Sequence, residues 1–409
     1  MIVQITTTDV AHGGYCVGRH ESIVVFATGA LPGEVVDVEI TNQRAKLWYG
    51  HVVAVISASD DRIDHVWPQG DSAGVQAADL GHVSLKAGRD WKARVIATQM
   101  RQLARIPVQV RVEPAPGDEA RLGLAWRTRL VLQVLRSGQL GMFRAKTHQV
   151  VSIDTMPLAH EDIQAAINNH VLVKPDHPGS TLSFVRASKS GLIVIPSSLK
   201  TGANSGSLTE EVSTKYGTWA YQVAPTGFWQ VHRQAPQVLV EAVLEAVGDT
   251  AGPVFDLYAG CGLFSVPLAE FYQGLVHAIE VSPLAGEYLR GNTADYGVKS
   301  LIGDVVDVLD TQQPTGGGVI VCDPPRSGAG RIAIAQMVRL GPDRIVYVAC
   351  DPATLARDVG LLVQYGYELS SLRGFDLFPM THHVECLAVL TRPSNSSAKL
   401  PSRLIAGNN

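Results

Sequence analysis

The fold of this chain is decided by the stretch Ile345-Val346-Tyr347-Val348-Ala349-Cys350-Asp351-Pro352-Ala353-Thr354-Leu355-Ala356-Arg357-Asp358. An apolar, β-branched run that stops at Cys-Asp-Pro and continues with helical spacing predicts a strand that feeds directly into a helix. Asp351 can cap that helix, and Pro352 suits its first position, where the missing N–H costs nothing. Cys350 is then expected at the carboxyl end of the strand, beside a helix N-terminus whose partial positive charge favours a thiolate.

The chain around this stretch, residues 226–393, alternates strand and helix patterns. Strands are expected at residues 254–258, 276–281, 301–302, 318–322, 345–349, 368–372 and 385–391. Strands that alternate with helices form βαβ units and a mainly parallel sheet, so this part is predicted to be an α/β domain. The last two strands have no long helix between them.

Two further domains are expected upstream. Residues 1–57 carry short alternating runs broken by glycine, which predicts a compact β-barrel. Residues 58–225 are predicted to be a mostly antiparallel α+β domain, with a helix over residues 79–106 that can pack on the α/β domain. The Ser- and Asn-rich tail, residues 394–409, is expected to be disordered.

Composition excludes several classes of protein. The 409 residues are 46% hydrophobic and 18% charged, and no apolar run approaches the roughly 20 residues that span a bilayer. No secretory signal is visible, so a soluble cytoplasmic protein, a monomer without a membrane partner, is expected. The five cysteines form no CxxC or CxxH pair, and we therefore expect neither a disulfide framework nor a metal site.

The charge is unevenly distributed. A formal net charge of −4 argues against indiscriminate binding of nucleic acid. Residues 121–150 nevertheless carry six basic residues and no acidic one. This stretch is either a set of solvated helix and strand faces or a surface that follows the phosphates of RNA.

A nucleotide-binding turn is predicted at residues 258–264, directly after a buried strand. Gly260 and Gly262 can bring the backbone close to a ligand at the carboxyl end of a parallel strand, although a GxG can also be only a tight turn. Acids follow the next strands: Glu280, where a carboxylate can accept both ribose hydroxyls, then Asp304 and Asp323. Three acids on one rim favour an adenosyl cofactor.

Two motifs belong to the opposite half of this predicted cleft. The loop Asp323-Pro324-Pro325-Arg326 resembles the Asp-Pro-Pro-aromatic loop of amino-methylating enzymes, but Arg326 replaces the aromatic ring. An arginine there suits a phosphate or a uracil carbonyl, so it is a candidate substrate contact. Glu385 directly precedes an apolar strand and can face the same cleft as Cys350.

Taken in order, these motifs resemble a known family. The barrel, with Lys46-Leu47-Trp48-Tyr49-Gly50, resembles the RNA-binding TRAM domain of the OB type, and the α/β part resembles the seven-stranded class I methyltransferase sheet. Asp-Pro-Pro-Arg, Ala-Cys-Asp-Pro-Ala-Thr-Leu-Ala-Arg-Asp and Phe-Pro-Met-Thr-His-His-Val-Glu are similar to motifs of the bacterial RNA (uracil-5-)-methyltransferase family. The resemblance implies S-adenosyl-L-methionine as cofactor and tRNA or rRNA as partner.

The resemblance also implies roles for individual residues. Cys350 is the nucleophile that adds to C6 of uracil, and Glu385 is the base that removes the C5 proton. Gln230, in Gly227-Phe228-Trp229-Gln230, contacts the cofactor together with Tyr258, Glu280, Asp304 and Asp323. Many family members bind an iron–sulfur cluster before the first long helix, but residues 66–76 contain no cysteine here, so no cluster is expected.

Two other functions remain open from the sequence. One is a class I methyltransferase that acts on another acceptor, such as cytosine C5 or an amine. The other is a non-catalytic RNA-binding protein with a vestigial cofactor site, which is disfavoured because the cysteine, the glutamate and the three acids occur together. The sequence does not specify which RNA or which uridine is methylated.

Overall fold

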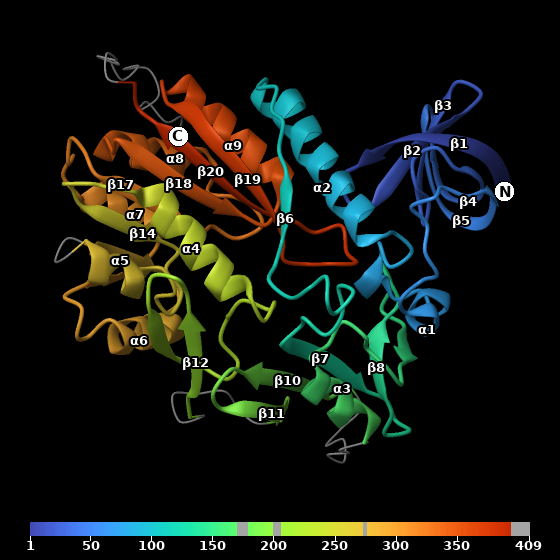
Figure 1. The fold of residues 1–409 in the computed structure, drawn as a ribbon, viewed down its shortest axis with the longest axis horizontal. Coiled ribbons are helices and arrows are strands. Elements are labelled where there is room, and N and C mark those ends of the chain that lie inside the picture. The colour runs from blue at the N-terminus through green and yellow to red at the C-terminus, as the bar shows by residue number, and fades with distance from the viewer. Residues whose placement is uncertain (170–178, 199–205, 273–275, 394–409) are drawn as a thin grey trace, which may run out of the picture.

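The computed structural model describes residues 1–169, 179–198, 206–272 and 276–393, so the predicted disorder of residues 394–409 lies outside the described residues. A closed barrel, an antiparallel sheet and a large mixed sheet follow one another along the chain (Figure 1). The α/β class, the small N-terminal barrel and the class I methyltransferase sheet predicted from sequence are confirmed. In the described ranges no helix is long and apolar enough to cross a membrane.

The barrel is closed by five strands in the order β1-β2-β3-β5-β4. Alternate side chains of β1 are buried from Val3 to Thr7, as its alternating sequence predicts, and the pattern shifts at a bulge between Thr7 and Asp9. The interior is filled by aliphatic residues such as Val3, Ile5 and Val25. The strands are β1 (Ile2–Ala11), β2 (Tyr15–His20), β3 (Ile23–Thr28), β4 (Val35–Arg44) and β5 (Leu47–Ser57).

The long helix after the barrel differs from the one expected at residues 79–106. Helix α2 (Leu85–Gln99) begins at Ser84, whose side chain accepts a hydrogen bond from the Ala87 N–H. Its end is a π-helical turn, Met100–Ala104, closed by Arg105 in the left-handed conformation. The preceding residues form α1 (Pro68–Ser72) and a 3₁₀ turn, Gln76–Ala78.

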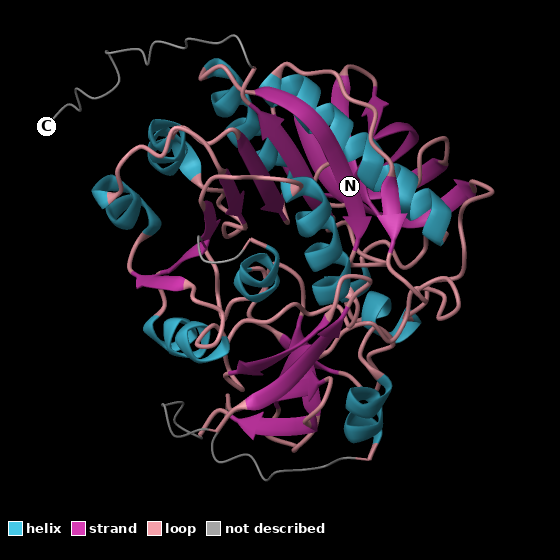
Figure 2. Ribbon diagram, turned by 60° about the vertical axis from the view of Figure 1, so that its left-hand side comes forward, coloured by secondary structure: helices cyan, strands magenta, loops and turns pink. Residues whose placement is uncertain are grey.

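The central part is a five-stranded antiparallel sheet with the order β11-β10-β7-β8-β9, below the large sheet in Figure 2. Its elements are β7 (Arg129–Val134), β8 (Leu140–Phe143), β9 (Val150–Ser152), α3 (Glu161–Asn168), β10 (Thr181–Ala187) and β11 (Gly191–Pro196). The two-stranded ribbon of β12 (Leu208–Ser213) and β13 (Thr218–Val223) then leads to the catalytic domain.

The large sheet has the order β16-β15-β14-β17-β18-β20-β19-β6. Alternate residues of its buried strands enter two separate cores, one beneath α4 and α5 and the other beneath α2, α8 and α9. Its strands are β14 (Val254–Leu257), β15 (Val276–Glu280), β16 (Lys299–Ile302), β17 (Val319–Cys322), β18 (Arg344–Ala349), β19 (Glu368–Asp376) and β20 (Glu385–Thr391). The helices are α4 (Ala235–Val247), α5 (Ser265–Phe271), α6 (Pro283–Asn292), α7 (Val305–Thr311), α8 (Gly330–Leu340) and α9 (Pro352–Gln364).

The eighth strand of this sheet comes from the preceding part of the chain. Strand β6 (Val112–Pro114) pairs in parallel with β19 through Gly374–Val112 and Phe375–Glu113, and lies beside it in Figure 1. Strand β6 therefore joins the large sheet, although it lies within residues 58–225, which the sequence analysis assigns to the central domain. Helix α2 covers the same edge, because Ile96 and Met100 enter the core shared with α9.

Candidate active site

Cys350 and Glu385 meet where the central parallel strand β18 lies beside the antiparallel strand β20. Ala349 pairs with Cys386 in this ladder, so the next position along places Cys350 opposite Glu385. Asp351 caps α9, as the sequence predicts, and its Oδ1 accepts hydrogen bonds from the N–H groups of Ala353 (3.0 Å) and Thr354 (2.9 Å). Of the five cysteines, Cys350 alone is not buried.

The charge around the thiol differs from the expectation based on the helix N-terminus. Burial and, to a smaller extent, the nearby carboxyl groups of Glu385 and Asp323 together raise the pKa of Cys350 to about 12, whereas Arg326 acts in the opposite direction. A thiolate favoured in the free protein is therefore a wrong prediction. The helix dipole is outweighed by desolvation and by two acids.

The two acids form a coupled pair. Burial raises the pKa of Asp323 to about 7, and burial together with Asp323 raises the pKa of Glu385 well above its usual value. Like charges in one poorly solvated site cannot both ionise easily, so the pair holds a proton to unusually high pH. A carboxylate with a raised pKa is a stronger base, which suits proton removal from carbon near neutral pH.

Arg326 acts on this centre through its charge, and it also interacts with Arg127 from another part of the chain. Arg326 is exposed in the loop after β17. The pKa of Arg127 is lowered mainly by burial and, to a smaller extent, by the positive charge of Arg326. The Arg127 guanidinium lies 5.7 Å from the ring centre of Trp126, and its Nε donates to the Arg129 carbonyl oxygen at 3.0 Å. In the part of the chain that the structure describes, neither Arg127 nor Arg326 has a carboxylate within 4.0 Å.

The glycine-bearing turn after β14 is built to approach a ligand. Tyr258 has a left-handed φ of 63°, which is rare for a bulky residue and indicates a backbone held in place by its surroundings. A Cβ on Gly260 would meet nothing within 4 Å, so this peptide faces open space. Glu280 stabilises the turn, because its Oε2 accepts from the Gly260 N–H at 2.8 Å and its Oε1 from the Ser282 N–H at 2.7 Å.

The remaining acids of the rim lie at the same sheet edge. Asp304 is exposed and caps α7, because its Oδ1 accepts a hydrogen bond from the Val306 N–H at 2.8 Å. Its Oδ2 takes no part in this bond. Beneath the turn, Asp256 is fully buried; its Oδ2 accepts from the Ser265 hydroxyl, and its Oδ1 has no partner among the residues that the structure describes. The open peptide after β14, with carboxylates at the ends of β15, β16 and β17 around it, fits an adenosine with its ribose hydroxyls.

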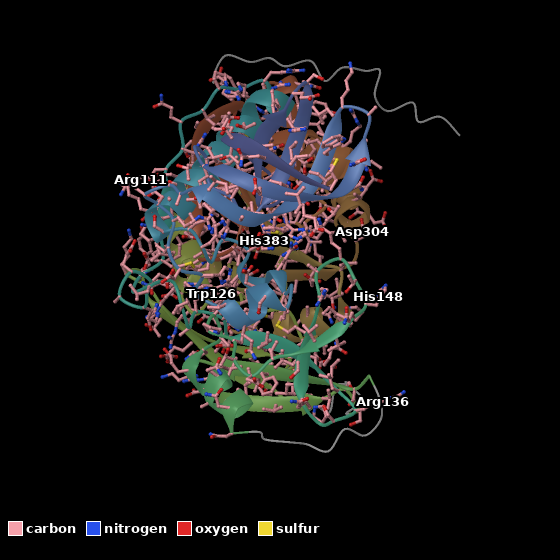
Figure 3. All side chains as sticks on the ribbon, turned by 90° about the vertical axis from the view of Figure 1, so that its right-hand side faces the viewer. Arg111, Trp126, Arg136, His148, Asp304 and His383 are labelled. Atoms are coloured by element: carbon pink, nitrogen blue, oxygen red, sulfur yellow. The ribbon has the colours of Figure 1, made fainter. Side chains whose placement is uncertain are left out.

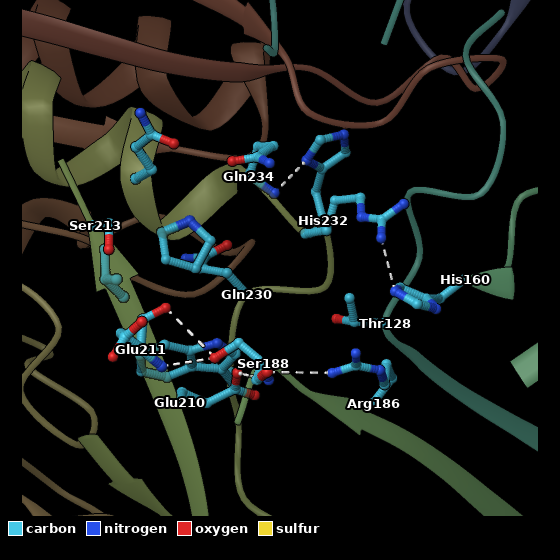
Figure 4. A pocket seen from close by; sticks show the side chains of 15 residues that line it. Thr128, His160, Arg186, Ser188, Glu210, Glu211, Ser213, Gln230, His232 and Gln234 are labelled. Carbon is cyan, nitrogen blue, oxygen red and sulfur yellow. Dashed lines mark hydrogen bonds between the residues drawn. The ribbon is translucent and has the colours of Figure 1, made fainter. Parts of the chain in front are cut away.

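Gln230 lines a cavity to which the other predicted cofactor residues do not contribute. This polar cavity, of about 400 Å³, lies between α4 and the central sheet and is also lined by Thr128, His160, Glu210 and Arg233 (Figure 4). None of the other predicted site residues lines this cavity. Trp229 beside it is buried in the same core as Cys261 and Leu263, so the backbone at Gln230 is anchored near the glycine-bearing turn.

Asp358 was not identified as a site residue from sequence, although it is the last residue of the strand-to-helix segment 345–358. It is fully buried in α9, and its Oδ2 accepts from the Tyr347 hydroxyl (2.7 Å) and from the Ala329 (2.9 Å) and Gly330 (3.2 Å) N–H groups. It thereby ties the segment that follows Arg326 to the helix that follows Cys350. The sequence does contain a sign of this role, because Asp358 is an acidic residue on the face of the predicted helix that is otherwise apolar.

The loop before Glu385 is held by residues that follow the barrel. Lys92 of α2 is buried against Asp376 (Nζ–Oδ1 2.5 Å) and donates to the Phe378 carbonyl oxygen at 3.0 Å. Asp79 binds the His382 N–H (3.1 Å) and Nδ1 (2.5 Å). His383 lies near mid-height in Figure 3, and burial lowers its pKa to about 4.

Known proteins share both this architecture and its motifs. The model of the tRNA (uracil-5-)-methyltransferase family matches residues 314–393, and the TRAM domain model matches residues 2–53. An uncharacterized RNA methyltransferase of Bifidobacterium longum is 36% identical, with 96% of this chain and 97% of the relative covered. One of Streptomyces avermitilis is 35% identical, with 95% and 97% covered.

A solved structure has the same fold. The tRNA (uracil-54, C5)-methyltransferase of Pyrococcus abyssi, in complex with S-adenosyl-L-homocysteine, is 20% identical and superposes with a TM-score of 0.71 over 95% of this chain and 100% of that one. The sequence relatives extend over nearly the full length, and the family model covers the loops that carry Cys350 and Glu385. The chain therefore belongs to the RNA methyltransferases of the tRNA (uracil-5-)-methyltransferase family, with an N-terminal TRAM domain.

Proposed function

We propose that the protein transfers the methyl group of S-adenosyl-L-methionine to C5 of a uridine in structured RNA, either tRNA or rRNA, through a covalent bond between Cys350 and C6. The observation that carries this proposal is the register of β18 and β20, which sets the one accessible cysteine opposite a glutamate with a raised pKa. A nucleophile and a base in one cleft are what this reaction requires.

The reaction has three steps. The sulfur of Cys350 loses its proton to solvent and adds to C6, and the electron pair of the C5–C6 double bond moves onto the C4 carbonyl, which gives an enolate with a nucleophilic C5. S-adenosyl-L-methionine would supply the methyl group that C5 takes up, and would leave as S-adenosyl-L-homocysteine. Glu385 then accepts the C5 proton, the C5–C6 double bond re-forms, and the S–C6 bond breaks to return the cysteine sulfur. Its raised pKa suits Glu385 to hold that proton.

Six residues are proposed to hold the cofactor. Glu280 would accept the ribose hydroxyls while its oxygens still anchor the turn, because a carboxylate has about four acceptor positions. Asp304 would contact the adenine end of the cofactor, and Asp323 would lie beside the reacting groups. Gly260 and Tyr258 supply the open turn, and Gln230 would reach the cofactor from the loop before α4.

RNA is the proposed partner of an exposed surface that extends from the active site to the barrel. Arg326 and Arg127 carry positive charge at the cleft, and Arg144 and Lys146 are exposed on the hairpin after β8. On the barrel, the ring of Tyr49 stacks on Phe26 with centres 5.3 Å apart. Cationic and aromatic groups in one surface suit phosphates and unstacked bases.

The test is adduct formation with RNA that contains 5-fluorouridine, whose fluorine cannot leave as the proton does. We expect a denaturation-resistant complex with the wild-type protein and with Cys16→Ala, a buried cysteine of the barrel, but none with Cys350→Ala. If Cys350→Ala still produces 5-methyluridine at the wild-type rate, the mechanism is refuted. Nucleoside analysis that finds 5-methylcytidine or a methylated amine would instead support another acceptor.

A further inference from the structure

The turn between β1 and β2 reaches out of the barrel to the residue that follows the proposed nucleophile. His12 Nε2 lies 3.0 Å from Asp351 Oδ2, and the two side chains are 39% and 24% exposed. The other oxygen of Asp351 caps α9. One carboxylate thus joins two partners, the helix that begins beside Cys350 and the barrel.

The same turn also contacts the loop that leads to Glu385. Gly14 has a φ of 78°, and a Cβ there would lie 2.5 Å from Asp79 Oδ2 and 3.4 Å from the His382 Cβ. Asp79 is the residue that fixes His382, three positions before Glu385. A third contact, between Tyr15 Oη and Lys146 Nζ at 2.6 Å, joins the turn to the central domain.

We propose that this turn couples the seating of the barrel to the geometry of the active site, and that His12 is a positioning residue for Cys350. His12 touches no reacting atom; it fixes Asp351, whose backbone carries the step from Cys350 into α9. The assignment of Cys350 as nucleophile rests on the proposed function, whereas the coupling itself rests on the contacts of His12 and Gly14.

The charges on both sides agree with a tight contact. Its hydrogen bond to Asp351 raises the pKa of His12 against the effect of burial. The pKa of Asp351 falls to about 2 because His12 and two helix N–H groups stabilise its charged form, although burial opposes this. The pair is therefore an imidazolium and a carboxylate over a wider pH range than either group alone would allow.

A coupling of this kind is reciprocal: RNA that favours the seated barrel also favours the fixed form of the Cys350 loop. At saturating RNA the affinity no longer limits the rate, so a change at His12 should appear in the chemical step, which a residue that only binds RNA would not alter.

The experiment compares His12→Ala, His12→Gln and a matched control in the full-length protein. His51→Gln is the control, because His51 is also a histidine of the barrel that pairs with a carboxylate, Glu39, at 3.2 Å, but within the barrel. Two rates are measured: alkylation of Cys350 by iodoacetamide without RNA, located by mass spectrometry, and methyl transfer at saturating RNA. Thermal denaturation checks that each variant is folded.

We expect His12→Ala to lower kcat about fivefold, the size of one charge-assisted hydrogen bond between half-exposed groups, with KM for RNA nearly unchanged. The alkylation rate of Cys350 should change as well, and His12→Gln should recover most of both effects because its amide can donate to Asp351. His51→Gln should match wild type. Unchanged kcat and alkylation in folded His12→Ala, or equal effects of His51→Gln, would overturn the proposal.

The alkylation arm separates this proposal from the proposed function. If the wild-type protein forms no adduct with fluorouridine RNA, the proposed function fails. The effect of His12→Ala on the reactivity of Cys350 would still be measured, since alkylation requires no RNA. A changed alkylation rate in His12→Ala would then still support the proposed coupling between the barrel and the Cys350 loop.

Discussion

Replacement of Lys92 tests how firmly the loop before Glu385 is held. The side chains of Lys92 and Asp376 are 1% and 4% exposed, and Lys92 also donates to the Phe378 carbonyl oxygen. Lys92→Met would leave a buried carboxylate without its partner, which costs about 3 to 5 kcal/mol. Because 1 kcal/mol shifts the midpoint of a domain of this size by about 2 to 4 °C, we expect a loss of about 6 to 20 °C.

The assay is differential scanning calorimetry of the transition that includes the catalytic domain, with two companion variants. Lys86→Met removes a lysine from the same helix, but this lysine is 81% exposed and pairs with an exposed Asp90, so the midpoint should stay near that of wild type. Adding Asp376→Asn to Lys92→Met removes the stranded charge and should restore part of the loss. A shift below about 2 °C for Lys92→Met, or a further loss in the double variant, would refute the reasoning.

Three other predictions address the site. Asp358→Ala should destabilise the protein by about 3 kcal/mol, measured by urea denaturation, because the Tyr347 hydroxyl and two backbone N–H groups lose their acceptor; wild-type stability would contradict this. Alkylation of Cys350 in the free protein should accelerate continuously from pH 7 to 10, since the pKa of the thiol is raised to about 12, and a plateau below pH 9 would show otherwise. If Arg127 and Arg326 contact phosphates, Arg127→Ala and Arg326→Ala should each lower the slope of log K against log salt by about 1 in RNA-binding titrations, and unchanged slopes would argue for other roles.

Much of the site was predictable because it lies at strand ends. The run that ends at Cys350 and the apolar strand that starts at Glu385 each show where a side chain leaves the sheet, and the antiparallel pairing of β18 with β20 brings the end of one strand beside the start of the other. The protonation state of Cys350 was not predictable in this way. Local sequence shows the helix N-terminus, but the desolvation and the two carboxyl groups that outweigh it come from other segments.

The contacts that support the site were also hidden from sequence. Lys92 and Asp376 are 284 positions apart, and His12 and Asp351 are 339 apart, so no local pattern pairs them. Strand β6 is only three residues long, and its partner β19 lies far along the chain. Such a strand carries too few residues for a periodic pattern, and only the assembled sheet specifies it.

Strand β6 has a consequence for how the protein is made. The catalytic sheet includes a piece of chain that is synthesised well before the rest of it, and α2 and β6 must wait for β19 to emerge. A fragment that starts at residue 226 would lack both elements and leave the backbone of β19 open to pairing with other chains. The methyltransferase domain is thus discontinuous in sequence, and a soluble minimal version must begin no later than Leu85, the first residue of α2.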